Sequence, residues 1–235
     1  MEFSRGRMPR RNGTIRASVS EIMTFTRTQF LFALTGAAAS AAQDPPKMHV
    51  FDRQDFVVDD FRAVGYILDI GGGGEGIIGQ MKPTQVIAID LSKRELEEAP
   101  AGPLKIVMDA TDLKFLDASF DTATAFFSLM YMKPEVQQRV LAELFRVLTR
   151  GGRWIIWDAV IPRALENDTR GPVFRFRFQV AGKMIQTGYG TFWPEKPMDL
   201  NYYKRLALDT GFEIDRAEQQ AGAFQTVTLE LRKPK

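Results

Sequence analysis

The sequence contains no cysteine and a single histidine, His49, among its 235 residues. Without cysteine the chain can form no disulfide, has no thiol nucleophile and cannot bind a metal through thiolates. One histidine cannot build a histidine-rich metal centre. We therefore expect no resident metal. Because cysteine is absent, its use indicates nothing about the redox compartment of the protein.

An excess of charge of either sign is also missing outside the N-terminus. The formal net charge is +2, but residues 1–43 carry six arginines and two glutamates, which leaves −2 for the rest of the chain. The chain after residue 43 has no excess of basic side chains, so its charge does not favour binding to nucleic acid. We therefore expect no nucleic-acid partner. The length and the 45% of hydrophobic residues suit one globular domain.

Residues 1–43 do not resemble the start of a folded domain. Residues 1–22 are polar and basic without apolar periodicity, so we expect them to be disordered or to precede a true start at Met23. Phe30–Ala39 is an apolar run that leads into Ala39-Ser40-Ala41, a pattern typical of a secretory signal. The alternative is an apolar helix that lies on the domain. We place the folded domain at residues 44–235.

The glycine-rich stretch 66–92 organises the rest of the chain. Apolar residues 66–70 lead into Gly71–Gly74, and a second apolar run, 86–89, ends at Asp90. This pattern predicts a strand, a glycine turn, a helix start and a second strand with an acid at its carboxyl end. Glycines let a ligand approach the backbone closely, and an acid at that place can accept hydrogen bonds from ribose hydroxyls.

Three further apolar runs, at residues 104–108, 120–127 and 154–157, predict strands that follow the first two. Helices are expected at residues 92–99, with Ser92 as N-cap, and from Pro134 to Arg150, where an apolar stripe precedes Gly151-Gly152. We count five strand–helix units. This alternation predicts an α/β sheet of mostly parallel strands.

The alternation stops after residue 158. Residues 173–180 alternate apolar and basic side chains, and after a turn residues 184–192 return, which predicts an inserted β-hairpin. A helix at 199–210 and two strands, 212–216 and 224–231, follow. Before the first strand, residues 49–61 predict a helix or a turn.

Taken in order, these features resemble the class I S-adenosylmethionine-dependent methyltransferases over about residues 60–235. Ile67-Leu68-Asp69-Ile70-Gly71 is similar to the first motif of that family. The family places glycines two, four and six residues after the acid, and here the third is Glu75. Shifting the register by one gives Gly72, Gly74 and Gly76, with the acid one residue too far back.

The resemblance implies a Rossmann-like, doubly wound, seven-stranded sheet whose last strand is antiparallel, and S-adenosylmethionine as cofactor. It makes Asp90 the acid that binds the ribose, and it sets Asp109 and Ala110 beside the adenine and Ser128 beside the methionine. The full expected cofactor set is Asp69, Gly71, Gly72, Gly73, Gly74, Asp90, Leu91, Asp109, Ala110 and Ser128.

Methyl transfer depends mainly on positioning, with a base needed only if the acceptor must lose a proton. The candidates for such a residue are Asp158 and Tyr131, which follow the fifth and fourth strands. A lone acid there is also a common cap, and a lone tyrosine a common core residue. His49 could also touch a substrate, although surface or structural histidines are commoner. The aromatic hairpin is a hypothetical lid over the acceptor.

We expect transfer of a methyl group from S-adenosylmethionine to a small-molecule acceptor. Two other functions fit parts of the pattern: a dinucleotide-binding oxidoreductase, and a non-catalytic binding or scaffold protein. Because the cofactor is cytosolic, we expect a cytoplasmic protein. Export is the alternative, since Thr26–Leu31 resembles a twin-arginine signal whose second arginine is replaced by Thr28. The apolar run is too short for a stable membrane span.

Overall fold

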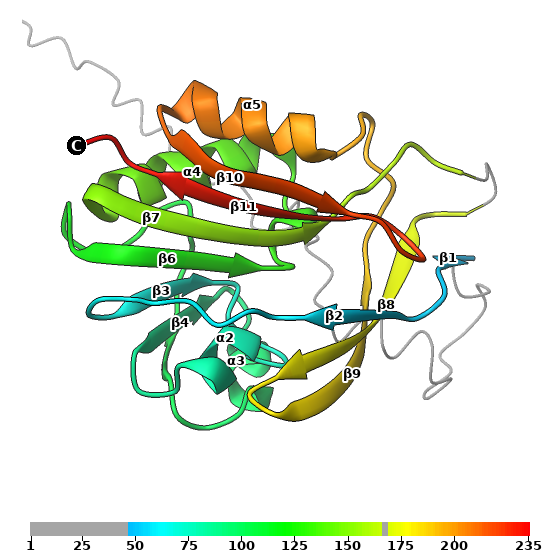
Figure 1. Cartoon of the computed structure of the whole chain (residues 1–235), viewed down its shortest axis with the longest axis horizontal. Coiled ribbons are helices and arrows are strands. Elements are labelled where there is room, and N and C mark those ends of the chain that lie inside the picture. The colour runs from blue at the N-terminus through cyan, green and yellow to red at the C-terminus, as the bar shows by residue number, and fades with distance from the viewer. Residues whose placement is uncertain (1–46, 166–168) are drawn as a thin grey trace, which may run out of the picture.

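The computed structural model describes residues 47–165 and 169–235. The signal-like segment predicted at residues 1–43 lies outside them. The described chain forms a seven-stranded sheet and a four-stranded sheet, and the smaller sheet lies at the carboxyl ends of the parallel strands of the larger one (Figure 1). No helix within the described residues is long and apolar enough to cross a bilayer.

The large sheet has the strand order β10-β11-β7-β6-β3-β4-β5. Five neighbouring strands are parallel, and β11 is antiparallel to both β7 and β10. This confirms the predicted mostly parallel sheet with an antiparallel last strand. The strands are β3 (Ile67–Ile70), β4 (Val86–Asp90), β5 (Leu104–Val107), β6 (Phe120–Phe126), β7 (Leu148–Ala159), β10 (Glu213–Gln220) and β11 (Thr226–Arg232).

Helices join these strands and end at residues that the sequence marks. Ser92 accepts a hydrogen bond from the Glu95 amide at 3.2 Å, as expected of an N-cap, and Gly211 ends the last helix in the left-handed conformation. The apolar stripe of the long helix is buried. The helical elements are α2 (Ile77–Met81), α3 (Lys93–Glu98), the short 3-10 helix η2 (Leu129–Tyr131), α4 (Pro134–Val147) and α5 (Leu200–Thr210).

Two expectations about the large sheet are wrong. Helix α4 ends at Val147 and β7 begins at Leu148, so Gly151 and Gly152 lie inside the strand. The connection from β5 to β6, residues 108–119, forms turns and no helix, so the expected count of five strand–helix units is too high. Its aspartates favour turns because they accept backbone hydrogen bonds; Asp109 does so from the Thr111 amide at 2.8 Å.

The small sheet contains the predicted hairpin, formed by β8 (Pro172–Val180) and β9 (Lys183–Gly190). The prediction of a helix or turn for residues 49–61 is wrong. That segment contains β1 (His49–Val50) and β2 (Gln54–Val57), which pair in parallel with β8. The strand conformation depends on a partner far along the chain, so local sequence carries little signal for it.

An aromatic core joins the two sheets. Side chains of β2 and the hairpin pack against the end of β6, and the rings of Phe127 and Phe176 have centroids 4.6 Å apart. All members of this group are less than 5% exposed. They are Phe56, Phe126, Phe127, Phe174, Phe176, Phe178 and Tyr189. The small sheet is therefore fastened to the edge of the large sheet where ligands of such folds bind.

Candidate functional site

The glycine turn between β3 and α2 requires glycine for reasons of space. Gly71 has φ +71°, and a Cβ added there would lie 2.6 Å from Cβ of Ser128. A Cβ at Gly72 would lie 2.7 Å from Oδ2 of Asp69. The turn thus lies directly between the end of β6 and the acid of β3, with no room for a side chain at Gly71 or Gly72.

Asp69 lies beneath this turn. Its side chain is 2% exposed, and its Oδ1 accepts a hydrogen bond from Thr124 Oγ1 at 2.7 Å. Thr124 belongs to β6, in register with Asp69. The buried acid therefore supports the turn from below, across two neighbouring strands.

Asp90 lies at the carboxyl end of β4 and borders the same turn. Its Oδ1 accepts a hydrogen bond from the Ser92 amide at 2.8 Å. Its Oδ2 is directed to the glycine turn, where a Cβ added at Gly73 would come within 2.9 Å of it. One carboxylate oxygen is thus held by the Ser92 amide, and the other lies next to Gly73 of the turn.

The adenine-side residues follow the next strand. The Met108 amide donates to the carbonyl of Asp90 at 3.0 Å, which brings Asp109 next to β4. Asp109 is exposed, Ala110 is buried, and Leu91 is 59% exposed. This end of the site is therefore open to solvent.

Ser128 lies at the opposite end of the site. Its hydroxyl donates to the carbonyl of Ile70 at 2.7 Å, and the residue is 5% exposed. Phe127, just before it, has φ +47°, an uncommon conformation for a bulky residue. Strained backbone of this kind gathers at functional sites.

The backbone amides of the turn are largely used within the protein. Gly71 and Gly72 both donate to the carbonyl of Ile89, and Gly74 donates to the carbonyl of Glu95 at 2.8 Å. A pyrophosphate would need such amides as donors. The turn is therefore built to lie close to a ligand and to present carboxylate acceptors around it.

The residues proposed for the acceptor side have structural partners. Asp158 is fully buried, and its Oδ2 accepts from the Met130 amide at 3.0 Å. Burial, and next the Asp158 carboxylate, raise the pKa of Tyr203 well above its usual range. Tyr131 lies in η2 and is partly buried. Asp158 therefore fixes the start of η2 and lies close to Tyr203 of α5.

His49 lies away from the glycine turn, at the start of the small sheet. Its ring packs edge-on against Phe51, with centroids 4.7 Å apart, and lies 6.3 Å from the ring of Trp193. This aromatic packing is a sufficient structural role for His49, and it involves no chemistry.

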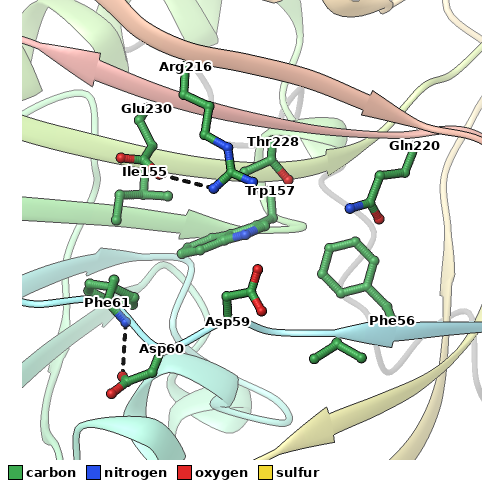
Figure 2. Close-up of a pocket in the computed structure, with 11 residues that line it drawn as sticks. Phe56, Asp59, Asp60, Phe61, Ile155, Trp157, Arg216, Gln220, Thr228 and Glu230 are labelled. Atoms are coloured by element: carbon green, nitrogen blue, oxygen red, sulfur yellow. Dashed lines mark hydrogen bonds and ion pairs between the residues drawn. The ribbon is translucent and has the colours of Figure 1, made fainter.

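A separate recess lies between the loop after β2 and the strands β7, β10 and β11 (Figure 2). Trp157 and Asp59 line it, and Arg216 on its rim is paired with Glu230 at 3.4 Å. None of the expected cofactor residues lines this recess, so we do not assign the cofactor to it.

Sequence reasoning missed several residues of the site. Thr124 supports Asp69, and Glu95 closes over Gly73, where an added Cβ would lie 2.5 Å from its own. Thr187 and Tyr189 of β9 reach the side chain of Glu75. Of these residues, the sequence pattern singled out only Glu75, because it replaces an expected glycine. The others gave no signal, since their partners lie on other elements.

The residues present fit S-adenosylmethionine. The ligand has hydroxyl and amine donors and no pyrophosphate, and this site offers the Asp90 carboxylate at a turn whose glycine positions a Cβ would fill. The predicted set also converges: Asp69, Gly71–Gly74, Asp90 and Ser128 surround one turn, with Asp109 beside it.

Comparisons with known proteins agree with this fold. Residues 68–156 match the family described as a methyltransferase domain. An O-methyltransferase of Penicillium expansum is 37% identical over 107 residues, which is 40% of this chain and 38% of that protein. A ubiquinone/menaquinone biosynthesis C-methyltransferase of Desulfotalea psychrophila is 31% identical over 131 residues, 52% of each. The chain thus spans about half the length of these curated relatives or less.

Among solved structures, an S-adenosylmethionine-dependent methyltransferase of Methanosarcina mazei superposes with a TM-score of 0.51 at 20% identity. The match covers 74% of this chain and 94% of that one. A likeness at this identity establishes the shared fold. Residues 68–156 thus match a methyltransferase domain, and the strand order shows that the chain shares the fold of the S-adenosylmethionine-dependent methyltransferase of Methanosarcina mazei.

Proposed function

We propose that the chain transfers a methyl group from S-adenosylmethionine to a small-molecule acceptor. The observation that carries this proposal is the Asp90 carboxylate, with Oδ1 fixed by the Ser92 amide and Oδ2 at the turn beside Gly73. Such a carboxylate accepts hydrogen bonds from two vicinal hydroxyls of a ribose. When bound, the cofactor supplies the methyl group on a sulfonium.

We further propose that the protein contributes position and exclusion of water rather than a base. Asp158 is fully buried and bonded to the Met130 amide, so it suits the role of holding η2. Displacement of a methyl group from a sulfonium depends mainly on alignment of the acceptor. The relatives support methyl transfer without selecting the acceptor, because their printed names include both oxygen and carbon methylation.

The first test is titration calorimetry of the full chain with S-adenosylmethionine, and with NAD as the competing ligand. We expect binding of the former only. Asp90→Ala should weaken it by tenfold or more, since hydrogen bonds to a charged group contribute roughly 1.5–3 kcal/mol. Asp112→Ala is the control, because Asp112 is exposed and pairs with Lys114 at 2.5 Å outside the turn.

The rival functions give different results in this experiment. An oxidoreductase would bind NAD, and a scaffold protein that does not use the site would bind neither ligand. Equal affinity of wild type and Asp90→Ala for S-adenosylmethionine would contradict the proposed ribose contact. Once binding is established, transfer of a labelled methyl group to a panel of small phenols, amines and quinols tests the acceptor class.

A further inference from the structure

Glu75 stands in the glycine turn at a place where the family resemblance expects glycine. Its side chain leaves the turn and meets β9 of the inserted hairpin. Thr187 Oγ1 donates to Glu75 Oε1, and Tyr189 Oη donates to Oε2 at 3.1 Å. Thr187 and Tyr189 are two residues apart on one strand, so they project to the same face. The backbone carbonyl of Glu75 is also fixed, by Gln80 Nε2 at 2.7 Å.

The hairpin also contacts the end of β6 and the start of η2. The rings of Tyr189 and Phe176 pack against Phe127, with centroids 5.6 and 4.6 Å away. Just past the hairpin, Thr191 Oγ1 donates to the carbonyl of Met130 at 3.1 Å. The hairpin and the residue just after it therefore contact Glu75 of the glycine turn. They also contact Phe127 and Met130, which lie on either side of Ser128.

Exposure differs sharply between the two ends of the site. Asp109 and Leu91, at one end, are exposed. Ser128 is 5% exposed and Phe127 is fully buried at the other end, where the hairpin packs. The end at Asp109 and Leu91 is thus open to solvent, whereas the end at Ser128 is closed, with the hairpin packed against the neighbouring Phe127.

We propose that Glu75 is a positioning residue that latches the β8–β9 hairpin over the Ser128 end of the site, and that this latch must release when ligand enters or leaves. Glu75 acts through Thr187 and Tyr189. The assignment of the ligand rests on the proposed function, but the latch itself is a property of the protein alone. Two hydroxyl groups donate to the Glu75 carboxylate, so this contact can hold the hairpin closed and can still break reversibly.

The latch is tested first without ligand, by amide hydrogen exchange on the full chain. In Glu75→Ala, and less so in Glu75→Gln, the amides of β8 and β9 should exchange faster, on the order of tenfold for the alanine variant, the effect of losing a hydrogen bond to a charged group. Amides of β7 should keep their protection. Glu97→Gln is the matched control, since Glu97 is an exposed partner of Lys93.

Milder variants guard against loss of the fold. Tyr189→Phe keeps the buried ring and removes one donor, and Thr187→Val keeps the shape and removes the other. Each should speed exchange of the hairpin, and combining Tyr189→Phe with Glu75→Gln should give less than the product of the two separate effects. Unchanged exchange in Glu75→Ala, or exactly multiplicative effects, would overturn the latch.

Ligand kinetics provide the second readout, with S-adenosylhomocysteine as probe in stopped-flow fluorescence. A latch sets the rate of access, so Glu75→Ala and Tyr189→Phe should raise the association and dissociation rates together by similar factors. A faster dissociation with an unchanged association rate would instead make Glu75 a direct ligand contact and refute the latch. If the wild type does not bind the probe, the proposed function fails, while the exchange experiment still decides the latch.

Discussion

Both the backbone conformation and the lack of space require glycine at position 71, and mutation can separate the two effects. It has a positive φ of 71°, and a Cβ there would also collide with Ser128; Gly182 in the hairpin turn has φ 76° with nothing within 4 Å. Gly182→Ala therefore measures only the backbone cost, about 1–2 kcal/mol. Gly71→Ala adds overpacking of about 1–3 kcal/mol.

We expect Gly71→Ala to lose more stability in urea unfolding than Gly182→Ala, and it alone should also weaken binding of S-adenosylmethionine. Calorimetry of both variants checks this. Equal losses of stability would show that Ser128 moves aside at little cost.

The residues of the site differ in how far sequence could predict them. Asp90 and Asp109 could be proposed from the sequence because each follows an apolar run directly, and the strand ends of a parallel sheet meet at one edge. The supporting role of Asp69 could not be predicted from the sequence, because it depends on Thr124 in a strand that is 55 residues away in sequence. Contacts such as those of Glu75 with β9 arise only from tertiary packing.

At the scale of elements, the turns from 108 to 119 are tied to α4 by one ionic cluster. Arg146 donates to the carbonyls of Leu113 and Phe115, each at 2.9 Å, and pairs with Glu143 at 2.7 Å. Glu143 also accepts from the Leu113 amide at 2.8 Å. This cluster fixes the connection between Asp109 and β6 against α4.

The cluster predicts an acid-sensitive contribution to stability. The hydrogen bond from Arg146, opposed in part by burial, lowers the pKa of Glu143, and the Leu113 amide lowers it further. Because this pKa is lower in the folded than in the unfolded protein, the stabilisation is complete above the ordinary glutamate pKa, about 4.3, and is lost as the pH falls below it. Glu143→Gln should therefore flatten the stability profile between about pH 5 and pH 3.

Urea midpoints of wild type and Glu143→Gln across this range provide the measurement. Glu213→Gln is the control, since Glu213 is 54% exposed and pairs with Arg232 at 3.3 Å. Parallel profiles for wild type and Glu143→Gln would show that the cluster does not respond to protonation.

Sequence patterns predicted most elements but not those whose form depends on distant partners. The five parallel strands and the hairpin carry their own apolar patterns and were found. β2 was taken for helix or turn because it mixes aromatic and acidic residues, and it becomes a strand only by pairing with β8. The early start of β7 at Leu148 likewise follows from pairing, with Phe120 of β6.

For the whole molecule, the aromatic core predicts that the two sheets unfold together. Phe176 is fully buried and contacts rings of both sheets, Phe127 from one and Phe178 from the other. Phe176→Ala should cost about 3–5 kcal/mol. It should lower the urea midpoint measured by tryptophan fluorescence and by circular dichroism equally. Two separate transitions in the wild type would contradict a shared core.

The parallel pairing of β2 with β8 has a consequence for synthesis on the ribosome. Gln54 is paired with Phe176, so β2 waits for about half of the chain to be made before its partner exists. At about 5–20 residues per second, this delay is on the order of 10 s. During that time Phe56, which ends in the aromatic core, is exposed on a nascent chain. The aromatic core around Phe56 can therefore close only after the hairpin has been made.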